Sequence, residues 1–195
     1  KTARHFLKQI GLQRPIQTIT FQTLDKHTLV NALDTLLEPI YTGKDMGLLS
    51  EAGCPAIADP GANLVRIAHE KQIHVFPLVG PSSILLALMA SGLNGQSFSF
   101  HGYLPIDRAS CIEKIIQIES ASLKLKQTQI FIETPYRNKK LFELLIAHCQ
   151  RSTHLCIASN LTLQGEAIKT RSIKDWQTNS PDFEKRPTVF LLQQY

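Results

Sequence analysis

Residues 46–61, MGLLSEAGCPAIADPG, constrain the fold of this chain more than any other segment. A short apolar run at 46–49 ends abruptly in the small and acidic residues of 50–53, and an Asp-Pro-Gly triplet at 59–61 then opens a helix-like stretch. Open α/β sheets place ligands where a buried strand ends in a small-residue loop with an acidic group. The segment therefore predicts a strand, a ligand-facing loop and a helix, in that order.

The chain up to residue 103 repeats this alternation. Apolar or aromatic runs predict strands at 46–49, 74–79 and 98–103. Apolar residues at helical spacing predict helices over 2–10, 29–37, 61–71 and 83–90. Asp25 is the candidate N-cap of the second helix. Strands that alternate with helices in this way favour βαβ units and a largely parallel sheet.

The rest of the chain also mixes strands and helices, after a hinge-like Gly-Tyr-Leu-Pro at 102–105. The pattern predicts helices over 112–119 and 141–148, strands over 129–132, 155–158 and 188–192, and a weaker edge strand at 166–171. We expect an α/β protein with two α/β domains. Residues 1–103 would hold a largely parallel sheet, and residues 104–195 a mixed one.

Composition narrows the class of protein. A hydrophobic content of 43% and a charged content of 19% are ordinary for a globular protein, and no apolar run is long enough to span a membrane. Without a signal-peptide pattern we expect a cytoplasmic protein whose four scattered cysteines are reduced. The histidines lack ligand spacing, so we expect no metal site. Most of the net charge of +5 follows residue 105, which fits an RNA partner or simply a solvated surface.

Four loops follow predicted strands and are the candidate sites. They are 50–53 with Glu51, 79–83 at a helix start, 132–138 with Glu133, and 159–162. Neither a P-loop nor a Gly-x-Gly-x-x-Gly pattern is present. Each loop alone could be a polar turn, a capped helix start or a solvated face. Together they indicate one cleft between two α/β lobes.

Several ordered segments identify a resemblance that covers essentially the whole chain. They are LLSEAGCPAIADPGANLVR, VFPLVGPSSILLALMASGL, FSFHGYLP, IFIETPYRN, ASNLT and RPTVFLL. In these segments the chain is similar to the tetrapyrrole methylase superfamily, and it resembles the branch that methylates the 2′-hydroxyl of a cytidine in 16S ribosomal RNA. The resemblance implies homodimers that bind S-adenosylmethionine in a cleft between two α/β domains, largely through backbone groups.

Carried over motif by motif, the resemblance implies a cofactor site drawn from both domains. Its residues would be Glu51, Ala52, Gly53, Cys54, Ser82, Ser83 and Ile84, with Glu133, Leu161, Pro187 and Thr188 from the second domain. The phosphates of the RNA would meet Arg137, Lys139 and Lys140. The general base is unassigned, and Glu133 is a candidate for it only if its carboxylate faces the acceptor.

Two departures from the family pattern qualify these expectations. Family members begin with a strand and a Pro/Gly-rich loop, whereas this sequence starts at what resembles the first helix, so we expect either a missing N-terminal stretch or a fragment with a damaged cofactor site. Glu51 stands where the RNA-directed branch usually has Asp, and residues 160–163 read Asn-Leu-Thr-Leu instead of Glu-Leu-Thr-Lys.

The expected function is therefore methyl transfer from S-adenosylmethionine to a ribose 2′-hydroxyl of small-subunit ribosomal RNA. Two alternatives remain open at this point. One is a methyltransferase with a small, tetrapyrrole-like acceptor, and the other is a non-catalytic binding module on the same scaffold.

Overall fold

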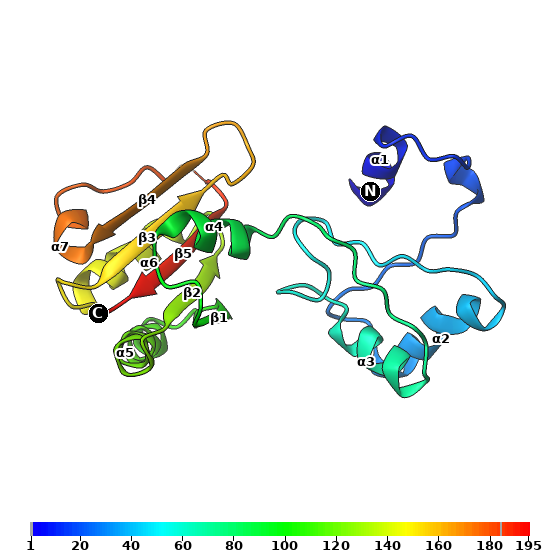
Figure 1. Cartoon of the computed structure of the whole chain (residues 1–195), viewed down its shortest axis with the longest axis horizontal. Helices are drawn as coiled ribbons and strands as arrows, with labels where there is room; N and C mark the ends of the chain where they lie inside the picture. Colours follow the sequence, from blue (N-terminus) through cyan, green and yellow to red (C-terminus); the bar gives the residue numbers. More distant parts are fainter. Residues whose placement is uncertain (1, 184) are drawn as a thin grey trace. The chain divides into compact units, whose positions relative to one another are not determined.

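The computed structural model describes residues 2–183 and 185–195. The chain divides into two compact units, Lys1–Ser82 and Ser83–Tyr195 (Figure 1). The predicted boundary lay later, between residues 103 and 104. The structure differs because the helix and the strand that follow Ser82 pack on the sheet of the second unit. Among the described helices, none has the length and apolar character needed to cross a membrane.

The first unit is built from helices and long loops. Its helices are α1 (Thr2–Gln9), the 3-10 turn η1 (Ile16–Thr18), α2 (Val30–Tyr41) and α3 (Ala62–Glu70). A small core forms where Leu33 and Leu37 of α2 meet Leu64 and Ile67 of α3. The three longer helices lie where the apolar spacing predicted them. The predicted cap is wrong, because α2 starts after Leu29 without a side-chain cap.

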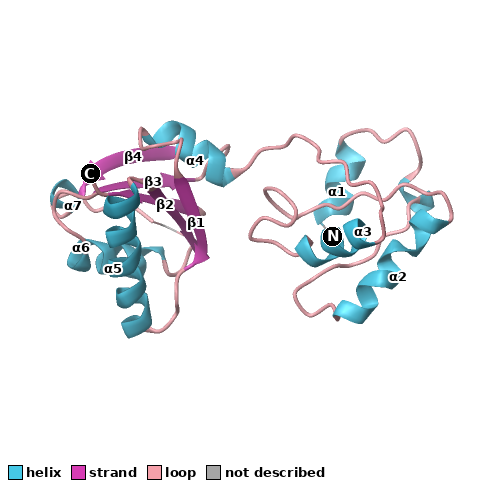
Figure 2. Ribbon diagram, turned by 60° about the horizontal axis from the view of Figure 1, so that its bottom comes forward, coloured by secondary structure: helices cyan, strands magenta, loops and turns pink. Residues whose placement is uncertain are grey.

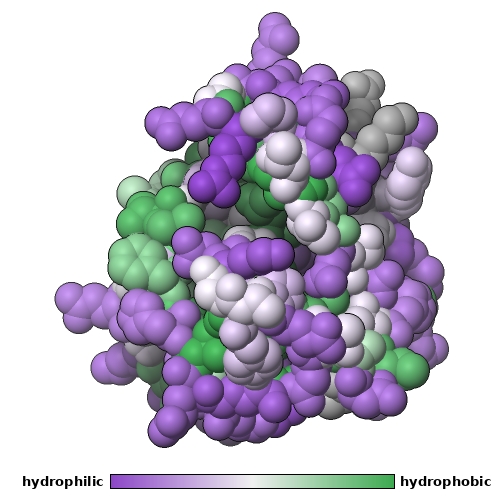
Figure 3. All heavy atoms as spheres, turned by 90° about the vertical axis from the view of Figure 1, so that its right-hand side faces the viewer, coloured by the Kyte–Doolittle hydropathy of each residue, from purple (hydrophilic) through white to green (hydrophobic). Residues whose placement is uncertain are grey.

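The strands predicted at 46–49 and 74–79 are not formed, and the described part of the first unit contains no β-strand. Leu48 instead packs against the start of α3, where a Cβ on Gly61 would lie 2.9 Å from the Leu48 side chain. The second segment is largely exposed, with 84% of Leu78 accessible. Apolar runs of this length do not specify a partner strand, and these two segments pair with none. The described residues of this half therefore do not form the largely parallel sheet that was predicted, and apolar side chains remain on the surface (Figure 3).

The second unit holds one five-stranded mixed sheet, which includes the strand at 98–103 that was expected in the sheet of the first half. Its strands are β1 (Phe98–Tyr103), β2 (Thr128–Glu133), β3 (His154–Ser159), β4 (Ala167–Ser172) and β5 (Thr188–Gln193). Their order is β1-β2-β5-β3-β4, with β1 parallel to β2 and the other pairs antiparallel. All five match the predicted strands to within a residue at each end, and β4 is an edge strand as expected.

Helices cover both faces of this sheet (Figure 2). One face packs against α5 (Arg108–Leu125), α6 (Asn138–His148) and α7 (Ile173–Trp176), over a core in which Phe131 and Phe190 stack. The other face packs against α4 (Ser83–Ser91) through Ala87 and Leu88. The α/β class is thus confirmed, and the layers leave the strand ends at the margin of the core.

Candidate functional site

Three polar side chains form a row across the sheet of the second unit. Glu133 ends β2, Thr188 begins β5 and Ser159 ends β3, and each lies directly opposite its neighbour in the register. Directly opposed residues of antiparallel strands project to the same face. All three are buried, with 4–5% of their surface accessible, and the hydroxyls of Ser159 and Thr188 are 3.0 Å apart. The row closes one end of the apolar core.

The carboxylate of Glu133 is engaged through both oxygens. Oε1 accepts the backbone N–H of Thr134 at 2.7 Å, and Oε2 lies 3.0 Å from the guanidinium of Arg137. The same guanidinium donates to the carbonyl of Pro105 at 3.4 Å. Proton abstraction by Glu133 would first require this ion pair to open. The geometry therefore favours a structural or binding role for Glu133 over general-base catalysis, and it places Arg137 inside the strand-end site.

Asn138, which begins α6, joins this row; it lies in the predicted loop 132–138 but was not named as a site residue. Its Nδ2 donates to the carbonyl of Arg186 at 2.8 Å and to the hydroxyl of Thr188 at 3.1 Å. The side chain is fully buried, and its Oδ1 has no hydrogen-bond partner among the described residues. A buried polar atom without a partner is costly in a folded protein and marks a place to look for a ligand. An Asn directly after Thr-Pro-Tyr-Arg at a strand end was the available signal.

The loop after β3 carries backbone strain. Asn160 and Thr162 have φ values of +53° and +66°, which non-glycine residues rarely adopt. The amide of Asn160 donates to the carbonyl of Pro187 at 2.9 Å, which ties this loop to the start of β5. Leu161 lies between the two strained residues and packs against the core on the α4 face. The structure thus brings the predicted residues Leu161, Pro187 and Thr188 into one connected group with Glu133.

The predicted residues of the first half are also partly gathered. The Ser50 hydroxyl donates to the carbonyl of Gly53 at 2.9 Å and closes a turn in which Glu51, Ala52 and Gly53 are exposed. The thiol of Cys54 is 3.6 Å from the carbonyl of Pro81, so the two predicted loops of this unit meet.

Ser82 ends the first unit, whereas Ser83 and Ile84 begin α4 in the second. The cleft between domains stays a prediction.

Buried thiols do not add a nucleophile to either site. Burial raises the pKa of Cys156 to about 11, and burial likewise raises the pKa values of Cys111 and Cys149. Thiols with raised pKa values stay protonated and unreactive near neutral pH. Within the described ranges, no group of three or more His, Cys, Asp or Glu side chains is placed to hold a metal ion. The sites therefore offer backbone groups, hydroxyls, an amide, the guanidinium of Arg137 and the carboxylates of Glu51 and Glu133.

Comparisons with known proteins agree on a family. A model of the family described as Tetrapyrrole (Corrin/Porphyrin) Methylases matches residues 3–177. Ribosomal RNA small subunit methyltransferase I of Vibrio cholerae serotype O1 is 31% identical over 183 residues, which cover 92% of this chain and 62% of that protein. The protein of the same name from Escherichia coli O157:H7 is 34% identical over 173 residues, which cover 87% of this chain and 59% of that protein. The chain spans about three fifths of the length of these relatives.

Solved structures show the same fold at lower identity. The methyltransferase CobJ superposes with a TM-score of 0.61 at 18% identity, covering 93% of this chain and 77% of that one. The uroporphyrin-III-C-methyltransferase of Thermus thermophilus gives a TM-score of 0.51 at 18% identity, covering 84% of this chain and 70% of that one. The family model, the relatives and the fold point the same way, and the chain belongs to the tetrapyrrole (corrin/porphyrin) methylase family.

Proposed function

We propose that this chain carries the activity of an S-adenosylmethionine-dependent methyltransferase that acts on a ribose 2′-hydroxyl of small-subunit ribosomal RNA. The observation that carries the proposal is the similarity, at about 30% identity and over nearly the whole chain, to proteins named ribosomal RNA small subunit methyltransferase I. The basic balance of the chain supports an anionic partner.

The strand-end group of the second unit consists of Glu133, Asn138, Ser159, Leu161, Pro187 and Thr188, and it supports a cofactor site through one buried atom. The amides of Asn160 and Thr162 are engaged by the carbonyl of Pro187 and the carboxylate of Glu166, whereas the unpartnered Oδ1 of Asn138 leaves a buried acceptor for a donor. Leu161, Pro187 and Thr188 would hold the cofactor here. In the first unit, Glu51, Gly53 and Cys54 would hold it from the loop that meets Pro81.

The bound cofactor would supply an activated methyl group on a sulfonium. Because that methyl is already a good electrophile, the protein has mainly to align the acceptor oxygen with it and exclude water. The ribose hydroxyl must lose its proton, which a base within hydrogen-bond reach would accept. Glu133 is held by Arg137, so its proposed part is to position the start of α6.

Calorimetry with S-adenosylmethionine tests the cofactor. We expect binding by the wild-type chain and weaker binding by Glu51→Ala, with Asp59→Ala in the same segment as the matched control. Binding that Glu51→Ala leaves unchanged would remove Glu51 from the site. If no binding is seen at about millimolar cofactor, the weak end of ordinary affinities, the proposal that the chain is a methyltransferase is refuted.

Transfer of labelled methyl groups to purified small ribosomal subunits tests the substrate. A 2′-O-methyl group removes the nucleophile needed for alkaline cleavage, so the labelled RNA should yield one alkali-resistant dinucleotide. Label recovered in mononucleotides would place the methyl group on a base instead. We also propose a homodimer, which light scattering on the purified chain tests directly.

A further inference from the structure

A hollow on the outer side of α5 and α6 is not used by the cofactor site. It has a volume of about 690 Å³ and is lined by Arg108, Tyr136, Lys139, Lys140, Glu143, Leu144 and Ala147. We call it the Tyr136 hollow. Its volume lies within the range of small-ligand sites. All its lining residues belong to the second unit.

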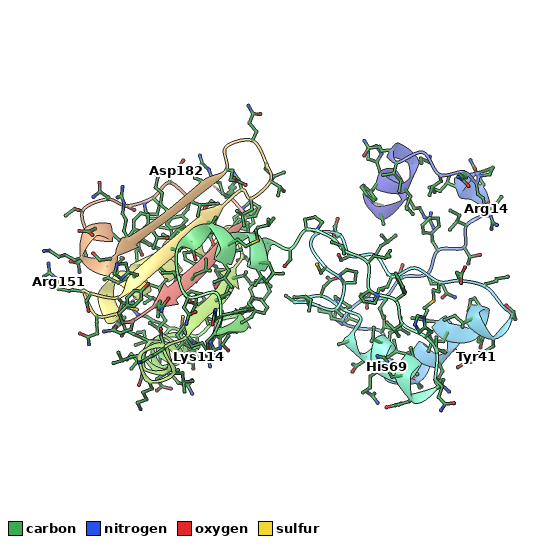
Figure 4. The ribbon with its side chains drawn as sticks, viewed as in Figure 1. Arg14, Tyr41, His69, Lys114, Arg151 and Asp182 are labelled. Carbon is green, nitrogen blue, oxygen red and sulfur yellow. The ribbon has the colours of Figure 1, made fainter. Side chains whose placement is uncertain are left out.

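The Tyr136 hollow carries a local excess of positive charge. Arg108, Lys139 and Lys140 are exposed and contribute three cations, against one carboxylate from Glu143. No ion pair within the described ranges engages any of the three cations. Lys114 and Arg151, two other cations of this unit, lie at two different places on it (Figure 4), and neither lines the hollow. The cluster therefore keeps an excess of positive charge that an anion would neutralise.

The positions of the two lysines also conflict with the preference of their helix. Lys139 and Lys140 lie in the first turn of α6, which contains no acidic residue. A helix N-terminus carries partial positive charge and favours anions, so cations there are unfavourable. Residue types that disfavour the local structure in which they stand are expected at functional sites. A bound phosphate would remove the conflict, because the lysines and the helix end would then attract the same group.

Tyr136 supplies a second, independent feature that points to nucleic acid. Its side chain is 80% exposed, and the ammonium of Lys185 lies over the ring at 5.6 Å from the centroid. An exposed aromatic ring among cations is the arrangement with which proteins bind single-stranded RNA: bases stack on the ring, and phosphates pair with the cations. Lys185 lies over one face of the ring, and with 80% of the residue exposed the ring keeps accessible surface on which a base could stack.

We propose that the Tyr136 hollow binds a single-stranded segment of RNA. One base stacks on Tyr136, and the neighbouring phosphates pair with Arg108, Lys139 and Lys140. The inference rests on the proposed function and extends it, because it names where the second unit holds the substrate strand. In this proposal Arg108 takes the place of Arg137 among the cations that contact the phosphates, because Arg137 is engaged in the ion pair with Glu133.

Fluorescence anisotropy with a labelled, unstructured RNA oligonucleotide tests the proposal in the absence of cofactor. We expect Tyr136→Ala to weaken binding at least about fivefold, the lower end of the effect of losing one base stack, and Tyr136→Phe to retain it. Each lost phosphate contact lowers the slope of log affinity against log salt by about 0.7 for a single strand. Lys139→Ala with Lys140→Ala should therefore lower that slope by about 1.4.

The matched control is Lys169→Ala with Lys174→Ala, which removes the same charge from exposed positions outside the hollow. An equal loss of RNA affinity in this control would show diffuse attraction and overturn the proposal. The proposal would also be overturned if Tyr136→Ala bound RNA as tightly as the wild-type chain while Lys139→Ala with Lys140→Ala weakened the binding of heparin and RNA equally. That result would show a general patch for polyanions. A Tyr136-dependent preference for an acidic peptide over the RNA would assign the hollow to a protein partner and also overturn it.

The outcome is separable from that of the proposed function. Cofactor binding by Tyr136→Ala should equal that of the wild-type chain, because the residue lies outside the strand-end group. Methyl transfer with Tyr136-independent RNA binding would leave the enzyme in place and remove the hollow. RNA binding that depends on Tyr136, in a chain that transfers no methyl group, would support the hollow and refute the proposed enzyme activity.

Discussion

Replacing Asn138 by Ala should destabilise the second unit and, at the same time, remove the hydrogen bonds that tie the start of α6 to the strand-end group. The substitution removes hydrogen bonds of 2.8 Å and 3.1 Å from a fully buried side chain. Each such bond contributes about 0.5–1.5 kcal/mol net, which sums to about 1–3 kcal/mol. Loss of the unpartnered Oδ1 offsets part of this, since burying it is itself unfavourable. We expect a decrease of about 2 kcal/mol in the free energy of unfolding.

The single tryptophan makes this measurable. Trp176 is buried in the second unit, and its indole N–H donates to the carbonyl of Leu155 at 2.8 Å, so its fluorescence during urea unfolding follows this unit. Thr188→Val removes the hydroxyl from the same network while keeping the shape of the side chain. In a double-mutant cycle, Asn138→Ala and Thr188→Val should couple by about 1 kcal/mol. Additive effects, or a loss below about 0.5 kcal/mol for Asn138→Ala, would refute the reasoning.

Three further outcomes are expected. Glu133→Gln should destabilise the second unit by about 1–2 kcal/mol in the same urea assay. The loss is smaller than for a fully buried ion pair because 30% of the Arg137 side chain is exposed. The double variant Glu133→Gln with Arg137→Met should recover part of the lost stability. The backbone N–H of Ser110, in the first turn of α5, donates to Asp107 and lowers the pKa of its carboxyl group. The stability that this carboxylate adds to the second unit should be fully present at pH values above the ordinary pKa of Asp. It should be lost as the pH falls through the lowered pKa. The stability difference between wild type and Asp107→Ala should then vanish in acid, and a pH-independent difference would contradict this. A thiol reagent should label the half-buried Cys54 first in the native protein, and rapid labelling of Cys156, whose pKa burial raises to about 11, would be inconsistent with the structure.

Local patterns predicted the elements of the second unit well. The strands are short apolar runs bounded by turn residues, and the weak alternation at 166–171 correctly indicated edge strand β4. The pairing order was not predictable, because it depends on contacts between segments far apart in the chain. The same limit explains the error at 46–49 and 74–79, where the apolar pattern is strand-like but no neighbouring strand pairs with it.

The candidate site shows the same division. Glu133 was recognised because it stands where a predicted strand ends, which is a local signal, whereas Leu161 was implied by the resemblance to the family. Asn138 was not recognised, since its partners, the carbonyl of Arg186 and the hydroxyl of Thr188, come from positions 48 and 50 residues later. Arg137 was read as a surface cation because its ion pair with a buried carboxylate depends on how the strand end meets the helix.

The place of β5 in the sheet has a consequence for the order of folding. β2 and β3 do not pair with each other; each pairs with β5, which follows the other four strands of this sheet in the sequence. During synthesis the halves β1-β2 and β3-β4 can each assemble early, but the core that joins them stays open until β5 emerges. A nascent chain that stalls before Thr188 would expose two unpaired sheet edges at once. Unpaired edges template pairing with other chains, so a stall at that point would favour aggregation.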